Sequence, residues 1–409
     1  MTEWREMRVG DCLAPVASET ASKVRARDYK IAGKYPVVDQ GKGLVAGWTD
    51  NAASVIRESG PVVVFGDHTR ALKYVDFPFA RGADGTQILK PVAGIGPRFF
   101  YFALRALGIP SRGYNRHFQL LRDSIIRVPH EDEQARVATV LSCIELAIAV
   151  QEEQVRAAGE LKRATMQALF TRGLHGEAQK VTEIGQVPES WDVVALGTVR
   201  EWLQYGTSVR CGLEPNGNPV LRIPNIESGR VNANDLKYGI HTADEVARYR
   251  LEVGDLLFIR TNGVVERLGT CAVFEGSPVD SLFASYLIRA RLDRERVDPR
   301  FVAHFFGSET GTAIVAGRAT PAADGKYNLN TGTIDGLPIP LPPSLAEQRE
   351  IATILDALER KLDLHRRKRV VLDELFKSLL HKLMTGEIRV ADLGIDALAA
   401  ATPGAGASA

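Results

Sequence analysis

Apolar residues recur at alternating intervals of three and four positions in two long stretches of the chain, residues 129–172 and 343–390. This spacing is typical of a helix that packs one apolar stripe against another helix. Pro129 and Pro343 mark the two starts, because proline ends the preceding segment and is tolerated where a helix begins. The pattern therefore predicts two long helices. The residues expected on their shared seam are Leu141, Ile144, Ile148, Leu355, Leu358 and Leu362.

The two stretches are copies of each other. Residues 129–171 align without a gap with residues 343–385 at an offset of 214, and 11 of the 43 positions are identical. A self-match at a fixed offset indicates duplicated structural units. Because each helix carries one apolar stripe, we expect its duplicate to cover it. An internal two-fold repeat would make the pair antiparallel.

The segments outside the helices predict two mixed α/β domains. Short apolar strands, such as residues 61–65 and 256–259, alternate with turns rich in Gly, Asp and Asn. The domains resemble distant copies, since Pro97-Arg98-Phe99 matches Pro299-Arg300-Phe301. The expected order is a first domain at 1–128, a helix at 129–172, a linker at 173–187, a second domain at 188–342, a helix at 343–390 and a disordered tail at 391–409.

Bulk composition fits an ordinary globular protein of 409 residues, with 45% apolar and 25% charged residues. No apolar run approaches the roughly 18 residues of a membrane span. The charged N-terminus lacks the apolar centre of a signal peptide. Four cysteines without a CxxC pair fit free thiols in a reducing compartment. We therefore expect a cytoplasmic protein.

Charge is unevenly divided between the two domains. Residues 1–128 hold 19 Lys and Arg against 12 Asp and Glu, a net charge of +7, whereas residues 179–342 hold 17 against 20, a net charge of −3. The first domain therefore suits a polyanion such as DNA. The overall charge of +1 hides this difference.

Sequence motifs for catalysis are missing. The chain has no GxxxxGK[ST] phosphate loop, no [ND]PP[YF] motif of amino-methyltransferases and no HExxH zinc motif. The isolated Gly41-Lys42-Gly43 is expected to be a turn. Asp67-His68 has no accompanying nucleophile or carboxylate pattern. We expect no catalytic residue, cofactor site or metal site in this chain.

Polar loops beside apolar strands offer the side chains that read DNA bases. Arginine forks onto guanine and asparagine onto adenine, while lysine contacts phosphates. These residue types also form ordinary turns, so each cluster has a structural alternative. The candidate DNA-binding residues are His68, Thr69, Arg70, Lys73, Arg112, Tyr114, Arg116 and His117 in the first domain, and Arg222, Asn225, Arg260, Thr261, Asn262, Lys326, Asn328 and Asn330 in the second.

Taken together, these motifs resemble the specificity subunit of type I restriction–modification systems. Each helix is entered through a Pro-x(3)-Glu-Gln motif, and the family-like segments occur in order over residues 4–390. The matching segments are YPVVDQG, FGDHTRALKYVDFPF and GYNRHF in the first domain, and LRIPNI, GDLLFIRTNG and PIPLPPSLAEQ in the second.

The resemblance implies two target recognition domains that read the halves of a bipartite double-stranded DNA site. It also implies that the paired helices dock two methyltransferase subunits, and that a restriction/translocase subunit joins the complex. S-adenosylmethionine, ATP and Mg²⁺ are then expected on those partners. Two alternatives stay open: a stand-alone DNA-modifying enzyme, and a coiled-coil adaptor that does not bind DNA.

Overall fold

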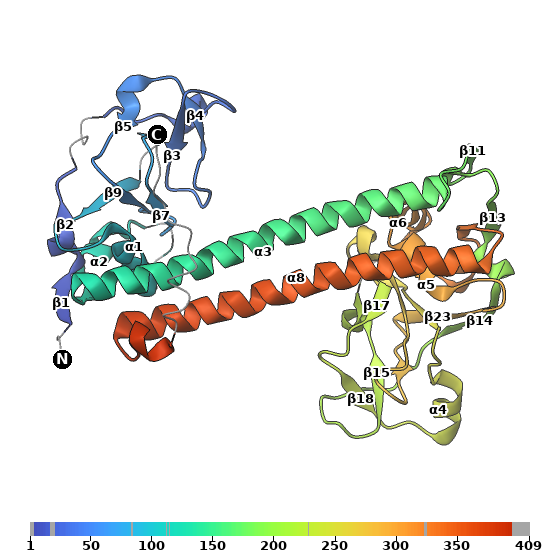
Figure 1. Cartoon of the computed structure of the whole chain (residues 1–409). Helices are drawn as coiled ribbons and strands as arrows, with labels where there is room; N and C mark the ends of the chain where they lie inside the picture. The colour runs from blue at the N-terminus through green and yellow to red at the C-terminus, as the bar shows by residue number, and fades with distance from the viewer. Residues whose placement is uncertain are drawn as a thin grey trace. The chain divides into compact units, whose positions relative to one another are not determined.

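The computed structural model describes residues 4–16, 21–82, 85–111, 113, 115–227, 229–322 and 325–394. The chain folds into two compact units. The first unit contains the described residues up to Glu152 and those from Arg367 onward, and the second contains Glu153–Arg366. Each unit therefore combines one domain of mixed helix and sheet with one part of each long helix (Figure 1).

The two long helices are α3, Glu131–Arg172, and α8, Leu345–Thr385. The first unit holds the start of α3 and the end of α8, and the second unit holds the remaining parts, so the helices are antiparallel (Figure 1). The expected fold class, two mixed domains with two long antiparallel helices, is confirmed.

Each long helix ends at a glycine. Gly173 and Gly386 follow the last helical residues with φ angles of 64° and 72°, a left-handed conformation that favours glycine and stops a helix. Helix α8 therefore ends before residue 390, where the sequence pattern placed its end. A 3-10 turn, Val390–Leu393, follows it. Residues 395–409 of the expected tail lie outside the described residues.

The first domain is built on two four-stranded sheets. Their strand orders are β2 (Leu13–Ala14), β9 (Thr86–Pro91), β6 (Val62–Gly66), β7 (Leu72–Val75), and β4 (Gly47–Thr49), β3 (Tyr35–Val38), β8 (Phe79–Arg81), β5 (Val55–Ile56). The strands β1 (Arg5–Arg8) and β10 (Ile125–Val128) form an antiparallel pair just before α3. The helices α1 (Pro97–Ala106) and α2 (Phe118–Asp123) complete the domain.

The second domain is built on a six-stranded sheet. Its strand order is β14 (Arg200–Tyr205), β23 (Leu287–Leu292), β19 (Leu256–Ile259), β21 (Cys271–Val273), β17 (Gly229–Val231), β16 (Ile226–Glu227). Two three-stranded sheets have the orders β18 (Lys237–Gly239), β15 (Asn218–Leu221), β22 (Leu282–Phe283), and β20 (Thr261–Asn262), β25 (Tyr327–Asn328), β24 (Thr320–Pro321). The strands β13 (Asp192–Ala195) and β26 (Pro338–Leu341) pair just before α8.

Short elements complete the second unit. Its remaining helices are α4 (Ala243–Tyr249), α5 (Pro299–Phe306), α6 (Glu309–Gly317) and α7 (Thr331–Asp335). The expected linker contains an antiparallel hairpin of β11, Gln179–Thr182, and β12, Gly185–Pro188. The second domain therefore begins soon after α3 with ordered backbone pairing.

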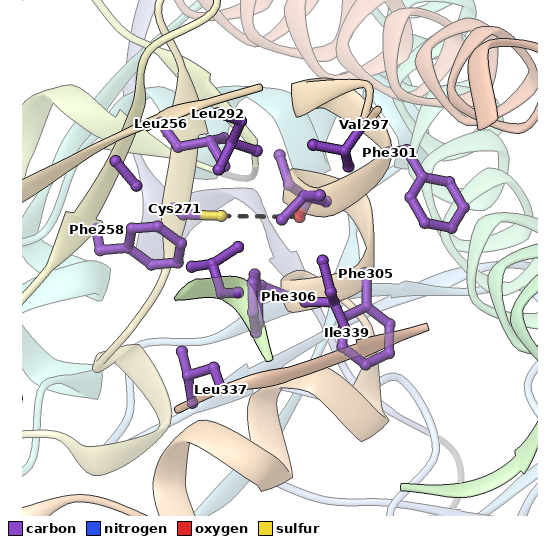
Figure 2. Close-up of a cluster of buried hydrophobic side chains, with 14 of the residues drawn as sticks. Leu256, Phe258, Cys271, Leu292, Val297, Phe301, Phe305, Phe306, Leu337 and Ile339 are labelled. Carbon is purple, nitrogen blue, oxygen red and sulfur yellow. Dashed lines mark hydrogen bonds between the residues drawn. The ribbon is translucent and has the colours of Figure 1, made fainter. Parts of the chain in front are cut away.

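Both long helices contribute to the core of each unit. In the second unit, the core that joins α5 to the six-stranded sheet includes Phe170 of α3 and Leu355 of α8. Figure 2 shows Phe258, Cys271 and Phe306 in this core, where the Cys271 thiol points at the Ala303 carbonyl oxygen, 4.0 Å away. Burial raises the pKa of Cys271 to about 12, so this thiol acts as a packing group.

Five of the six predicted seam residues lie in or against these cores. Leu141 is fully buried in the core of the first unit, and Ile144 and Ile148 pack against the same cluster. In the second unit, Leu355 is fully buried in the core and Leu358 packs against it. Leu362 is also buried, with 4% of its surface exposed. The apolar stripe thus packs against the adjacent domain as well as against the other helix.

The glutamine of the Pro-x(3)-Glu-Gln motif fastens each helix to its domain. Nε2 of Gln348 donates to the carbonyl oxygens of Arg296 and Pro342, at 3.2 and 3.3 Å, and Oε1 accepts from the backbone N–H of Asp298 at 2.9 Å. Gln134 occupies the same position in α3. It makes the same three contacts, with the carbonyls of Gly94 and Pro129 and with the N–H of Gly96. We call these two sets the glutamine clasps.

The glutamate of the motif reaches the chain that leaves the other helix. Glu133 Oε1 accepts from the backbone N–H of Val390 at 3.2 Å, just beyond α8. Glu347 Oε1 accepts from the N–H of Leu174 at 3.5 Å, just beyond α3. The two identical residues of the repeated motif therefore have matching structural roles in both units.

Candidate DNA interface

The hairpin tip between β6 and β7 carries the first predicted cluster. Asp67 is 3% exposed, and its Oδ1 accepts the backbone N–H groups of His117 and Phe118, each at 2.7 Å. Two amides at the start of α2 therefore satisfy this carboxylate. Asp67 therefore caps the start of α2. This is a structural role, not a role in a catalytic pair with His68.

Two predicted DNA-binding residues of the first domain are buried. His117 is 0% exposed, and its Nδ1 lies 2.9 Å from the carbonyl oxygen of Asp67. Lys73 is 5% exposed and donates to the carbonyl of Asp39 at 2.7 Å; burial lowers its pKa. Because buried side chains do not reach a duplex, the prediction that these two contact DNA is corrected. They position the loops around them.

The remaining described candidates of this domain lie at the surface. Thr69, Arg70 and Arg116 are exposed, and His68 is half-buried. Arg70 has a left-handed backbone with φ 62° and donates from its guanidinium to the carbonyl of Ile109 at 2.9 Å. The hairpin tip therefore carries the exposed Arg70, and Arg116 precedes His117, whose backbone N–H bonds to Asp67 at the tip. Arg112 and Tyr114 lie outside the described residues.

A neighbouring loop that the sequence analysis did not single out joins this surface. The carbonyl of Gln40 accepts from the Thr69 hydroxyl, and its side-chain oxygen lies 3.4 Å from the His68 N–H. The loop that begins here exposes Lys42 and Leu44. Gly41-Lys42-Gly43 follows Gln40, so the contacts of Gln40 with Thr69 and His68 connect this loop to the candidate interface.

In the second domain, Asn225 holds a loop together. It is 0% exposed; Oδ1 accepts from the Arg222 N–H at 2.9 Å, and Nδ2 donates to the carbonyls of Asn232 and Asn234. The prediction that Asn225 reads DNA is therefore corrected, because its amide is buried and already bonded. The guanidinium of Arg222 donates to the carbonyl and the carboxylate of Asp235, at 2.6 and 3.0 Å.

Two predicted clusters of the second domain meet in one small sheet. Strand β20 pairs with β25 so that Thr261 lies opposite Asn328, and Asn262 lies opposite Tyr327. These four residues come from sequence segments more than 60 positions apart. The segments Arg260–Gly263 and Lys326–Asn330 thus form a single surface element.

Within this element, two asparagines also serve as caps. Oδ1 of Asn262 accepts from the Val264 N–H at 2.9 Å. Oδ1 of Asn330 accepts from the Thr333 N–H at 2.8 Å and so caps α7. Lys326 is exposed, and Thr261 and Asn328 are half-buried.

The segment after β22 connects this sheet to the Arg222 loop. The N–H of Ala284 donates to the carbonyl of Leu221 at 2.9 Å, and the N–H of Arg260 donates to the carbonyl of Tyr286 at 3.1 Å. We call the surface formed by residues 205–210, 222, 260–263, 284–286 and 326–330 the second loop cluster. It includes two exposed aromatic residues that the sequence analysis missed, Tyr205 and Tyr286.

The net negative charge of the second domain does not determine the local charge of the second loop cluster. Several acidic residues form ion pairs elsewhere in the domain: Asp335 with Arg200 at 2.8 Å, and Asp255 with Arg291 at 2.8 Å. Among the described residues, no ion pair involves Arg210 or Arg260. The loop cluster can therefore be locally basic within an acidic domain.

Other kinds of site have no support in the described part of the chain. It contains no group of three or more His, Cys, Asp or Glu side chains placed to hold a metal ion. None of its helices is long and apolar enough to cross a membrane.

Comparison with known proteins points to one family. Residues 188–374 match the family described as "Type I restriction modification DNA specificity domain". The putative type I restriction enzyme MjaX specificity subunit of Methanocaldococcus jannaschii is 30% identical over 210 residues, which cover 50% of this chain and 48% of the relative. The MjaVIII specificity subunit of the same organism is 24% identical over 273 residues, which cover 66% and 63%.

The alignments thus span less than two thirds of the length of these two curated relatives. The fold extends over nearly the whole chain. The crystal structure of the type I restriction–modification S subunit from M. genitalium has a TM-score of 0.66 at 15% identity, covering 94% of this chain and 96% of that one. The sequence of its second half is thus similar to type I restriction–modification specificity subunits, and the chain shares the fold of the M. genitalium S subunit over nearly its whole length.

Proposed function

We propose that this chain is the DNA sequence-recognition subunit of a type I restriction–modification complex. Each domain reads one half of a bipartite site in double-stranded DNA through its loop surface. The observation that carries this proposal is the duplication: each unit joins a domain with Arg- and Asn-bearing loops to a long helix through the same glutamine clasp, at Gln134 and at Gln348. Two readers in one chain suit a target with two parts.

The partners and their chemistry follow from this role. The paired helices dock two methyltransferase subunits, which bind S-adenosylmethionine. A restriction/translocase subunit brings ATP and Mg²⁺. The chain itself transfers no methyl group and drives no ATP-dependent translocation, because its sequence lacks the methyltransferase motifs and the phosphate loop that those activities use. The complex works in the cytoplasm, where DNA and S-adenosylmethionine are both present.

The experiment is methyl transfer from labelled S-adenosylmethionine to DNA. It compares the purified chain, a methyltransferase subunit from the same system, and the two together. The proposal predicts sequence-specific methylation by the assembled complex only. Methylation by the chain alone would support a stand-alone enzyme. A complex that forms but neither binds nor methylates DNA with any sequence preference would support the coiled-coil adaptor.

A further inference from the structure

Arg260 is fixed in the second loop cluster by its backbone. Its N–H donates to the carbonyl of Tyr286 at 3.1 Å, and its carbonyl accepts from the N–H of Leu329 at 2.8 Å. The first contact belongs to the segment after β22 and the second to the segment after β25. The Cα atom of Arg260 therefore has a defined place between two loops.

The side chain of Arg260 lies over an aromatic ring. Its guanidinium carbon is 4.7 Å from the centroid of the Tyr205 ring, at the end of β14. Its Nη1 also donates to the carbonyl of Ser285 at 3.3 Å. A cation above a ring face is held by the ring's quadrupole, and the planar guanidinium can stack on that face. Tyr205 thus limits the conformations open to Arg260.

Tyr205 is itself held at both ends. Its hydroxyl oxygen accepts from the backbone N–H of Thr331, at the start of α7, at 3.2 Å. Gly206 follows it at a close approach of two chains, where an added Cβ would lie 2.2 Å from the carbonyl oxygen of Phe283. The ring therefore forms a rigid support rather than a mobile exposed side chain.

Arg260 differs from Arg222, the other arginine predicted in this cluster. Arg222 gives its guanidinium to the carboxylate of Asp235 at 3.0 Å. Arg260 has no carboxylate partner among the described residues, and its one polar side-chain contact there is with Ser285. Of the two, only Arg260 is without a carboxylate partner; its Nε is buried, and its Nη2 makes no hydrogen bond to a described residue and is left for a ligand. Guanine offers two acceptors, O6 and N7, which match two donors of an arginine fork.

We propose that Arg260 reads a guanine in the half-site of the second domain and that Tyr205 is its positioning residue. The inference rests on the proposed function. Tyr205 pre-orders the guanidinium, so that the free chain already presents Arg260 in the conformation that binds the base. The cost of ordering a long side chain on binding is thereby reduced.

The test uses the complete complex with its methyltransferase subunits. It measures methylation of a DNA library in which each position of both half-sites is varied. Arg260→Ala should lose the preference for guanine at one position of one half-site, by about tenfold or more. Tyr205→Ala should lose it at the same position, and Tyr205→Phe, which keeps the ring, should retain most of it. The other half-site should be unchanged in all three variants.

Trp202 provides a matched control. It is exposed on the same strand, and its ring lies 5.5 Å from a guanidinium, that of Arg289, which is 2% exposed and so does not reach a ligand. Trp202→Ala should therefore leave every base preference as in the wild type. Tyr205→Leu fills the space without an aromatic face and replaces the alanine variant if that variant does not fold.

The outcomes separate the two levels of the argument. Loss of the guanine preference in the Arg260 variant but not in folded Tyr205→Ala or Tyr205→Leu overturns the positioning role. Wild-type preference in the folded Arg260 variant overturns the whole inference while leaving the proposed function intact. A wild-type complex without any sequence preference overturns the proposed function itself.

Discussion

Gln348 holds the backbone N–H of Asp298 at 2.9 Å and thereby joins the first turn of α8 to the start of α5. Gln134 holds the N–H of Gly96 at 2.8 Å and joins α3 to α1 in the same way. Both glutamines are almost fully buried. The identical residue in the two helix copies is thus explained by an identical contact, which sets where each helix leaves its domain.

Gln348→Ala should destabilise the second unit. The substitution leaves the N–H of Asp298 and the carbonyls of Arg296 and Pro342 without their side-chain partner in a buried place. Leaving such groups unpaired costs about 1–3 kcal/mol. The measurement is the free energy of unfolding of the full chain in urea. Gln154→Ala, an exposed substitution on α3, is the control and should change little. Equal stabilities for the two variants would contradict the role of the clasp.

Asp356 should make the second unit sensitive to acid. It accepts from Nε2 of His304 at 2.8 Å and from Arg300 at 3.1 Å. Although burial of Asp356 alone would raise its pKa, the hydrogen bond and charge of His304, with the charges of Arg300 and Arg230, lower its pKa. A carboxylate with a lowered pKa stabilises the fold above its unfolded pKa, about 4, and this contribution is lost as the pH falls through the lower, folded pKa.

Asp356→Asn tests this account. At neutral pH the variant should be less stable than the wild type by about 1–3 kcal/mol, because Arg300 and His304 lose their carboxylate partner. The difference should shrink as the pH falls below about 4. Unfolding free energies measured from pH 7 to pH 3 give the two curves. A difference that stays constant over the whole range would show that Asp356 does not carry the acid dependence.

The helices and the duplication could be predicted from the sequence because they are properties of local spacing. The spacing of apolar residues and the constant offset between the two copies can both be read directly from the sequence, without knowledge of the fold. The structural role of the repeated Glu-Gln pair could not be predicted, because it depends on contacts between distant segments. Glu133, for example, bonds to Val390, more than 250 positions away. The end of α8 at Thr385 could have been predicted from Gly386, since a glycine often follows the last helical residue. The spacing of apolar residues alone does not mark this end.

The loop predictions show the limit of residue type as a guide. Lys73, His117 and Asn225 have the side chains of a DNA-binding surface, but burial turns them into supports of their loops. Tyr205 was missed because its significance lies in its contact with Arg260, across segments that the sequence does not relate. The meeting of β20 with β25 depends on sheet pairing in the same way.

Arg116 and Lys73 should differ in their effect on DNA binding. Arg116 is exposed, whereas Lys73 is buried against Asp39. If Arg116 contacts a phosphate, Arg116→Ala should lower the slope of log affinity against log salt by about 1. Lys73→Met should leave that slope unchanged and lower the stability of the first unit. Binding of the assembled complex to its DNA at several salt concentrations provides the comparison, and the opposite ranking of the two variants would contradict the assigned positions.

The central claim is that one chain reads two separate half-sites. It is tested most directly by single-molecule sequencing of methylated bases in DNA exposed to the complete methyltransferase complex. The account predicts one motif made of two specific half-sites separated by a gap of constant length and arbitrary sequence. A single continuous motif, or methylation without a common motif, would contradict it.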